Sequence, residues 1–205
     1  MIKIGILGDI GAGKSFISNL FGYPVFNADA EVRKIYKKNY KCFLKLKYEF
    51  PSFITKFPVL KEEILNLIEN KKSNIIKIGK IVHPYVRKNL KLFLKKNRNK
   101  KIVILDIPLL LENKLNSNDM ILIFIETKKK DVLKRLKKRK YFNFKLHKTI
   151  KNNQLALSIK RKKSDFIIKN NFKIQYVKKN IKKIKKELKN YDWNYTRYWN
   201  NRFIG

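Results

Sequence analysis

The segment that most constrains this chain lies at residues 3–15, where a short apolar run leads into G-D-I-G-A-G-K-S at residues 8–15. This is the pattern G-x-x-x-x-G-K-[ST]. Its glycines let consecutive backbone N–H groups turn toward phosphate, its lysine reaches the outer phosphates, and its hydroxyl can ligate Mg²⁺. The flanks fit, because residues 3–7 can form a buried parallel strand and residues 15–21 a helix facing the phosphates. The segment therefore predicts a P-loop that holds a triphosphate; the alternative is a glycine-rich turn followed by a coincidental Lys-Ser pair.

Short β-branched or aromatic segments recur along the chain with helical patterns between them. The strand candidates are Lys3–Leu7, Val25–Asn27, Ile102–Asp106, Met120–Glu126 and Phe166–Ile168. Strands that alternate with helices form parallel sheets covered on both faces. We therefore predict an α/β fold of the P-loop kinase type, with a mostly parallel five-stranded sheet and helices on both faces.

The spacing of these segments also predicts how the chain is organised. Residues 30–100 contain helical patterns, such as 60–69 and 85–96, and no convincing strand, which predicts a helical insertion between the second and third strands. The basic segment 137–148 is the expected lid, and residues 177–190 should form a lysine-faced helix. We predict one domain over residues 1–190, followed by an aromatic tail at 191–205.

The net charge of +36, from 51 basic and 15 acidic residues, raises the possibility of a nucleic-acid partner. Only eight of the basic residues are arginine, the side chain best suited to forked phosphate contacts, and the lysines are spread along nearly the whole chain. Lys, Asn, Ile, Phe and Tyr are enriched together, which indicates A/T-rich codons. We expect no specific nucleic-acid partner, although a nucleic-acid-binding protein with a nucleotide site stays open as an alternative.

Other features of the composition bear on location and partners. Cys42 is the single cysteine, and no apolar run approaches the about 18 residues of a membrane span. We therefore expect a cytoplasmic protein without a membrane partner, as a monomer or weak homo-oligomer. The tail contains both tryptophans; it could stack on bases, but packing on its own domain or on a second copy is the more common role of such aromatic groups.

Two acidic residues lie at the ends of predicted strands. Asp29 lies just after residues 25–27, and Asp106 ends the strand at 102–106. The carboxyl ends of strands form the ligand crevice of an open α/β sheet, so both carboxylates should face the P-loop. Asp29 could accept the proton of an attacking hydroxyl or cap the following helix. Asp106 has the position of a carboxylate that reaches Mg²⁺ together with Ser15.

Two arginines and one histidine complete the candidates. Arg135 and Arg139 are spaced i, i+4 on a predicted helix that leads into the expected lid, where guanidinium groups would stabilise the transferring phosphoryl oxygens; the alternative is a solvated charged face. His83 precedes Pro84 at the expected start of a helix. A lone histidine in this position is more often a cap or a partly buried residue than a base.

With these residues assembled, the chain resembles the dephospho-coenzyme A kinases over most of residues 3–170. The resemblance rests on five features: the P-loop, Asn27-Ala28-Asp29, His83-Pro84, the segment Asp106-Ile107-Pro108-Leu109-Leu110-Leu111-Glu112, and Arg135 with Arg139. The spaced series Gln154, Lys160, Asp165 and Asn170 also fits. Pro-Leu-Leu-x-Glu together with His-Pro and this series is specific, whereas a P-loop alone is shared by many kinases.

The resemblance implies phosphorylation of the ribose 3′-hydroxyl of dephospho-coenzyme A, with ATP as co-substrate and Mg²⁺ as metal. Asp29, Lys14, Arg135 and Arg139 would be catalytic, His83, Leu111 and Glu112 would shape the acceptor pocket, and Ser15 and Asp106 would hold the metal. ATP would contact Gly8, Ile10, Gly11, Ala12, Gly13, Lys14, Ser15, Phe16 and Asn170. A different nucleotide or small-molecule kinase on the same scaffold is the main alternative.

The chain departs from the family pattern at four positions. Asp9 replaces a glycine and brings a negative charge beside the phosphates, which would weaken ATP binding unless a lysine offsets it. Phe16 replaces a threonine, Asn27 an aspartate and Ser164 an alanine. None of these changes removes an essential group.

Overall fold

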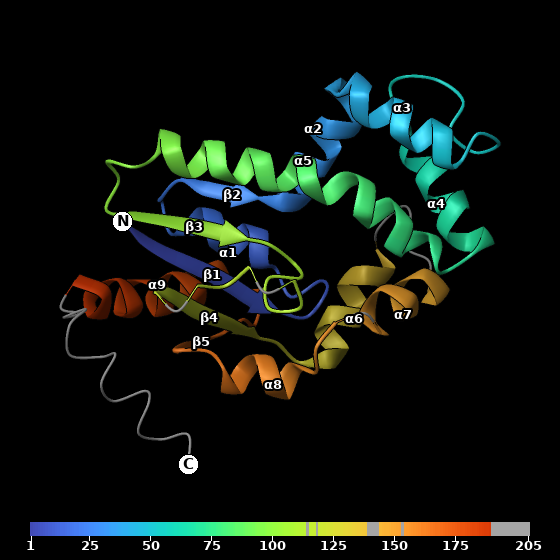
Figure 1. Cartoon of the computed structure of the whole chain (residues 1–205). Coiled ribbons are helices and arrows are strands. Elements are labelled where there is room, and N and C mark those ends of the chain that lie inside the picture. The colour runs from blue at the N-terminus through green and yellow to red at the C-terminus, as the bar shows by residue number, and fades with distance from the viewer. Residues whose placement is uncertain (114, 118, 139–143, 153, 190–205) are drawn as a thin grey trace, which may run out of the picture.

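A computed structural model describes residues 1–113, 115–117, 119–138, 144–152 and 154–189 (Figure 1). The strands are β1 (Ile2–Gly8), β2 (Val25–Asn27), β3 (Ile102–Asp106), β4 (Met120–Glu126) and β5 (Phe166–Lys169). The helices are α1 (Lys14–Leu20), α2 (Ala28–Lys38), α3 (Tyr40–Glu49), α4 (Lys61–Asn70), α5 (Asn74–Lys96), α6 (Lys129–Lys137), α7 (Phe144–Asn152), α8 (Leu157–Lys162) and α9 (Ile174–Lys189).

The five strands form one parallel sheet in the order β2-β3-β1-β4-β5. This confirms the predicted sheet, and each predicted strand differs from the observed one by at most one residue at either end. Because β1 lies at the centre, the chain crosses to opposite sides of it to reach β3 and β4. Such a reversal opens a crevice at the carboxyl ends of the strands, and the P-loop follows β1 at that edge.

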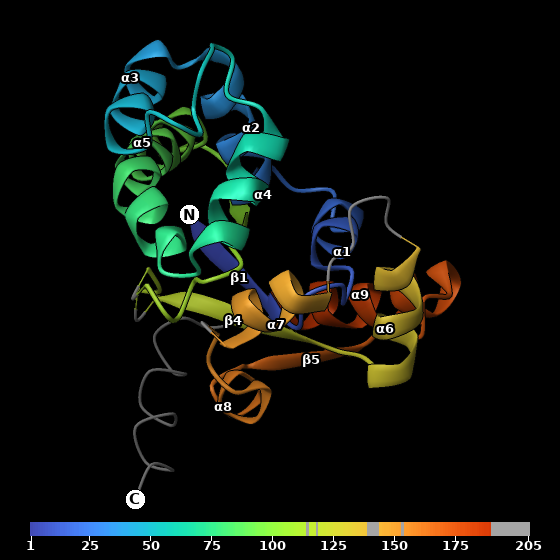
Figure 2. The same ribbon diagram turned by 90° about the vertical axis from the view of Figure 1, so that its right-hand side faces the viewer.

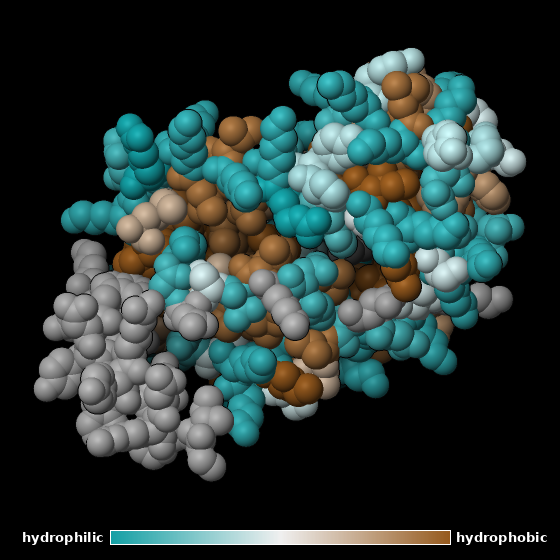
Figure 3. All heavy atoms as spheres, in the orientation of Figure 1, coloured by the Kyte–Doolittle hydropathy of each residue, from teal (hydrophilic) through white to brown (hydrophobic). Residues whose placement is uncertain are grey.

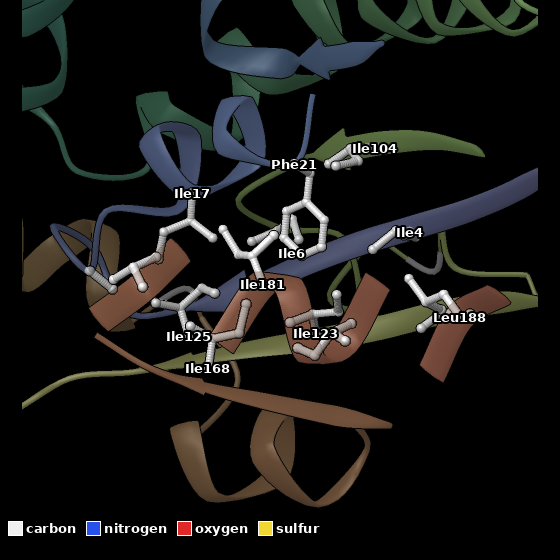
Figure 4. Packing of buried hydrophobic residues seen from close by; sticks show 14 residues of the cluster. Ile4, Ile6, Ile17, Phe21, Ile104, Ile123, Ile125, Ile168, Ile181 and Leu188 are labelled. Atoms are coloured by element: carbon white, nitrogen blue, oxygen red, sulfur yellow. The ribbon is translucent and has the colours of Figure 1, made fainter. Parts of the chain in front are cut away.

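One face of the sheet is covered by α1 and α9 (Figure 1). Figure 4 shows isoleucines of β1, β4 and β5 packed against Ile17 and Phe21 of α1 and Ile181 of α9. The buried side chains of α9 recur every three or four residues, at Val177, Ile181, Ile184 and Leu188. This spacing places one apolar stripe on the sheet and leaves the lysines outside, which confirms the predicted terminal helix.

Helices α2 to α5 form the predicted insertion between β2 and β3, and the described residues 28–101 contain no strand. Helices α2, α3 and α4 stand together beyond the carboxyl end of β2, and α5 runs back from them alongside β2 (Figures 1 and 2). Their apolar faces meet in a separate cluster that includes Cys42, Leu46, Ile54 and Leu67, all fully buried. The insertion therefore has its own core, while its long helix α5 also reaches the second face of the sheet through Phe93, which packs on Phe26 of β2.

The predicted position of His83-Pro84 at a helix start is wrong. Pro84 lies inside α5, which begins ten residues earlier at Asn74 and runs for 23 residues. A proline within a helix removes one backbone hydrogen bond and crowds the preceding turn. Ile78 and Val82 are buried in the insertion core on the turns before Pro84, and this packing holds those turns in the helix despite the proline.

Hydrophilic side chains lie over both the sheet and the helical insertion on the face shown in Figure 3, with apolar groups between them. They are not gathered in a single band, in line with the dispersed lysines of the sequence. No helix of the described residues combines the length and the hydropathy that a membrane crossing requires. The aromatic tail at 191–205 lies outside the described residues, so its role stays a prediction.

Candidate active site

The P-loop is shaped by glycines in conformations that other residues rarely adopt. Gly8, Gly11 and Gly13 have φ values of 146°, 85° and 87°. A Cβ atom at Gly11 would lie 3.0 Å from Leu136 of α6, so the loop lies tightly against that helix. Gly13 precedes α1, and no side chain caps the first turn of this helix. The loop therefore leaves backbone N–H groups available for phosphate oxygens.

Lys14 is held inside the loop that precedes it. Its Nζ donates hydrogen bonds to the carbonyl oxygens of Gly8, at 3.2 Å, and Asp9, at 2.9 Å. Burial lowers the pKa of Lys14, while the carboxylates of Asp106, Asp29 and Asp9 act in the opposite direction. The ammonium group is therefore poorly hydrated and lies among three acidic residues, an arrangement suited to bind a phosphate.

Asp106 lies opposite Asn27, because β2 and β3 pair in parallel with these two residues in register. Both the Ser15 hydroxyl and the Asn27 amide donate to Oδ2 of Asp106, and the Asn27 nitrogen lies 3.0 Å from Ser15 Oγ. Burial raises the pKa of Asp106, although the Ser15 hydrogen bond and the Lys14 charge oppose that shift. The predicted proximity of Ser15 and Asp106 is confirmed, whereas the contacts of Asn27 with both residues were not predicted.

The residues around Asp106 could hold a magnesium ion that has few protein ligands and keeps several bound water molecules. Ser15 and Asp106 offer a hydroxyl and a carboxylate oxygen, the hard ligands that Mg²⁺ prefers. No three His, Cys, Asp or Glu side chains cluster as a metal cage within the described residues. Such an ion would therefore need phosphate and water oxygens to complete its shell, as in other phosphoryl-transfer sites.

The raised pKa of Asp106 leads to a stability prediction for D106N. A carboxyl group whose pKa is raised by folding destabilises the folded state above that pKa, and this cost disappears below the unfolded value of 3.8. The amide oxygen of the new side chain can still accept from Ser15 and Asn27. We expect D106N to unfold at higher temperature at pH 7, by about 2–4 °C for each kcal/mol recovered, and to turn over more slowly. Calorimetric scans between pH 4.5 and 8 should show that the difference in melting temperature between D106N and the parent protein becomes smaller as the pH falls. A D106N protein that melts below the parent at pH 7 would contradict this account.

Asp29 occupies the second position of α2 with an exposed carboxylate. Helix α2 is capped instead by Asn27, whose Oδ1 accepts from the backbone N–H of Ala30 at 2.7 Å. The alternative role of Asp29 as a helix cap is therefore not supported by the structure. The charge of Asp29 raises the pKa of both Lys14 and Asp106, which places its carboxylate within electrostatic reach of the P-loop.

A pocket of about 140 Å³ lies between α2, α5 and the segment after β3, and Asp29 lines it. His83 and Arg87 of α5 line the opposite side. Burial and the nearby Arg87 charge lower the pKa of His83, so its ring is neutral at pH 7. The pocket therefore places a carboxylate, a neutral imidazole and a guanidinium group around one space.

Leu111 and Glu112 lie elsewhere. Leu111 is buried in the core, and Glu112 forms a 2.8 Å ion pair with Lys160, whose side chain is 1% exposed. The same Glu112 oxygen accepts from the backbone N–H of Leu155 at 2.9 Å. Among the described residues that line the His83 pocket, neither Leu111 nor Glu112 appears, so their role in acceptor binding stays a prediction. Through its pair with Lys160, Glu112 joins the segment after β3 to α8.

The loop after β5 is joined to the P-loop. Asn170 donates to the carbonyl oxygen of Ala12 at 2.8 Å and accepts from the N–H of Phe172 at 2.9 Å. The Arg135 guanidinium lies 4.5 Å from the centre of the Phe172 ring, in cation–π geometry. Asn170 and Arg135 were candidate site residues, whereas the contact of Phe172 with Arg135 was not predicted. Phe172 has a φ of 62°, in the left-handed region. Arg139 lies outside the described residues.

Asp9 has the lysine partner that its charge requires. Its Oδ2 lies 2.9 Å from Nζ of Lys151, a residue of α7 that follows the expected lid. Sequence analysis did not find Lys151, because one lysine among so many carries no distinguishing local pattern.

The family of this chain follows from its similarity to known proteins. A family model described as dephospho-CoA kinase matches residues 2–175. The chain belongs to the dephospho-CoA kinase family. The dephospho-CoA kinase of Wolbachia pipientis wMel is 31% identical over 186 residues, which cover 88% of this chain and 95% of that protein. The dephospho-CoA kinase of Rickettsia typhi is 32% identical over 197 residues, covering 92% and 98%.

Solved structures of other proteins share the fold of this chain. A protein from Thermus thermophilus superposes with a TM-score of 0.73 at 25% identity and covers 91% of this chain and 97% of its own. The dephospho-CoA kinase from Campylobacter jejuni gives a TM-score of 0.59 at 26% identity, covering 91% and 98%. A shikimate kinase from Bacteroides thetaiotaomicron, at 12% identity and a TM-score of 0.52, shares the fold alone. The predicted P-loop kinase fold is thus confirmed.

Proposed function

We propose that this chain transfers the γ-phosphoryl group of ATP to the ribose 3′-hydroxyl of dephospho-coenzyme A, giving coenzyme A and ADP. One observation of the site carries the proposal: Asp29 lines a pocket with His83 and also acts electrostatically on Lys14 of the P-loop. A group that faces both a pocket and a phosphate-binding lysine can meet the acceptor hydroxyl and the donor phosphate at once. Membership of the family supplies the identity of the acceptor.

In this mechanism, the backbone N–H groups of Gly11 and of residues 13–15 bind the donor phosphates together with the Lys14 ammonium, while the Ala12 N–H donates within the loop to Asp9. Asp29 accepts the proton of the acceptor hydroxyl as its oxygen attacks the γ-phosphorus in line with the leaving oxygen. Arg135 stabilises the charge on the phosphate oxygens from the side of α6, and Arg139 would do so from the expected lid. Positioning and charge stabilisation supply most of the rate enhancement.

The remaining donor contacts are also assigned. Gly8, Ile10 and Phe16 would flank the phosphates and Asn170 would lie near the adenine; the bond from Asn170 to the Ala12 carbonyl, which joins it to the P-loop, supports this assignment. Ser15 and Asp106 would hold Mg²⁺, which would supply positive charge to offset that of the phosphate groups. His83 contributes to the acceptor pocket as a neutral hydrogen-bonding group.

The location that we propose is a reducing cytoplasm, with the chain as a monomer or weak homo-oligomer. Cys42 is buried in the insertion core, and burial raises the pKa of its thiol to about 11. At neutral pH the group is therefore a thiol with little nucleophilic thiolate, in keeping with a packing role.

The acceptor assay tests the proposed function most directly. Purified protein is mixed with MgATP and dephospho-coenzyme A, and both products are measured by chromatography. We expect coenzyme A and ADP in equal amounts. If nucleoside monophosphates or shikimate are phosphorylated instead, the chain is a different kinase on the same scaffold. Salt-resistant RNA binding that survives Lys14→Ala, without transfer to any acceptor, would favour the nucleic-acid alternative.

A further inference from the structure

The ion pair between Asp9 and Lys151 joins two segments that lie 142 residues apart. Asp9 is the second residue of the P-loop, and Lys151 lies near the carboxyl end of α7. The carboxylate is well shielded: its side chain is 11% exposed, whereas that of Lys151 is 40% exposed. Asp9 Oδ1 accepts from the N–H of Ile10 at 2.8 Å, and Oδ2 accepts from Lys151 at 2.9 Å. Both carboxylate oxygens are therefore used.

The backbone of Asp9 also belongs to the phosphate-binding apparatus. Its carbonyl oxygen accepts from Lys14 Nζ at 2.9 Å and from the N–H of Ala12 at 3.2 Å. The carboxylate is thus attached to the residue that orients the phosphate-binding lysine. Its charge acts on the Lys14 ammonium directly. An unneutralised carboxylate here would repel a triphosphate and compete with it for Lys14, with little water to screen the interaction.

The ion-pair geometry identifies Lys151 as the cation that offsets Asp9. Both line a pocket of about 260 Å³, together with Glu126 and Arg161. Glu126 and Arg161 are already paired with each other at 3.1 Å. Lys129 lines the same pocket, but its side chain is exposed and forms no ion pair with Asp9 among the described contacts. Among the described residues, Lys151 is the cation in ion-pair contact with Asp9.

We propose that Lys151 is a positioning residue for ATP binding, which acts through Asp9 by neutralising its carboxylate beside the phosphate cradle. Because the contact spans the P-loop and α7, the same pair holds this helix against the loop. The proposal rests on the proposed function, since it assumes that the P-loop binds ATP. The unfavourable negative charge of Asp9 and the Lys151 ammonium that neutralises it both belong to this chain.

The test is calorimetric titration of MgATP into the protein without an acceptor. We expect K151M to raise the dissociation constant for MgATP about tenfold, equal to about 1.4 kcal/mol. K151Q keeps a hydrogen-bonding group but loses the charge, and it should weaken binding similarly. K151R should stay within about threefold of the parent protein. K100M is the control, because Lys100 is an exposed lysine before β3, at the amino end of the sheet and away from the P-loop.

The decisive variant is the double substitution D9N/K151M. With the carboxylate neutral, loss of Lys151 should no longer matter, so binding should return to within about threefold of the parent protein. In steady-state assays, K151M should raise the KM for ATP and leave the KM for dephospho-coenzyme A unchanged. Melting temperatures of all variants separate these effects from loss of fold.

Three results would overturn the inference: unchanged MgATP binding in K151M and K151Q, equal weakening in K100M, or a double variant as weak as K151M. The proposed function fails separately, if the parent protein binds no MgATP or transfers no phosphoryl group to dephospho-coenzyme A. A parent protein that binds MgATP and variants that bind it equally well would remove only the role of Lys151.

Discussion

D29N should lower kcat by about a thousandfold while leaving MgATP binding within about twofold of the parent protein. A positioned general base contributes about 10²–10⁴ in rate, and the amide cannot accept the proton of the acceptor hydroxyl. The substitution keeps the size of the side chain. It also leaves the α2 cap in place, because Asn27 supplies that cap. Single-turnover transfer and calorimetric titration together give the two quantities.

Glu31→Gln provides the matched control for D29N. Glu31 is a second acidic residue in the first turn of α2, but its carboxylate contacts Lys34 and Asn89 instead of the acceptor pocket. We expect this control to keep the parent turnover rate. A D29N protein within about tenfold of the parent kcat would remove Asp29 from the role of base and would leave it a contact of the acceptor.

K14M should abolish high-affinity MgATP binding and lower turnover by about a thousandfold or more. The buried ammonium of Lys14 is the group placed to meet the outer phosphates, and loss of a single preorganised donor to a developing charge costs about 10²–10³ in rate. Lys14 also offsets the carboxylates of Asp106, Asp29 and Asp9. In its absence, these three charges would face the triphosphate directly.

The fold should survive K14M, because burial lowers the pKa of Lys14 and the folded state is therefore a costly place for its charge. Melting temperatures check this point. K100M is the control, since Lys100 is exposed in the turn before β3, at the amino end of the sheet and away from the P-loop. Unaltered MgATP affinity in K14M would show that the phosphates bind elsewhere.

Much of the fold follows from local sequence patterns. The strands are recognisable because parallel strands buried on both faces require continuous apolar runs, and each run here is short and bounded by polar or turn residues. Asp106 was placed at the site because it ends such a run. The start of α5 was mistaken because Pro84 is a strong local signal for a helix boundary, whereas burial of Ile78 and Val82 depends on helices that are distant in the sequence.

In the candidate site, too, some residues could be predicted from local sequence and others could not. The P-loop, the two acidic residues after strands and the arginine of α6 have local contexts that identify them. Asn27 as cap and as partner of Asp106, the Glu112–Lys160 pair and the stacking of Phe172 under Arg135 have none. Each depends on side chains that meet only after the sheet has brought its carboxyl ends together.

By itself, the sequence determined that a phosphate-binding loop follows the first strand of a parallel α/β sheet, and that a helical insertion separates its second and third strands. These features depend on periodicity and on glycine backbone conformations, which act over a few residues. Only the tertiary structure decided that Asp9 is offset by Lys151, that Asp29 faces a pocket lined by His83, and that Glu112 pairs with Lys160. Charge compensation and burial act through space, and one lysine among many carries no local sign of the carboxylate it will meet.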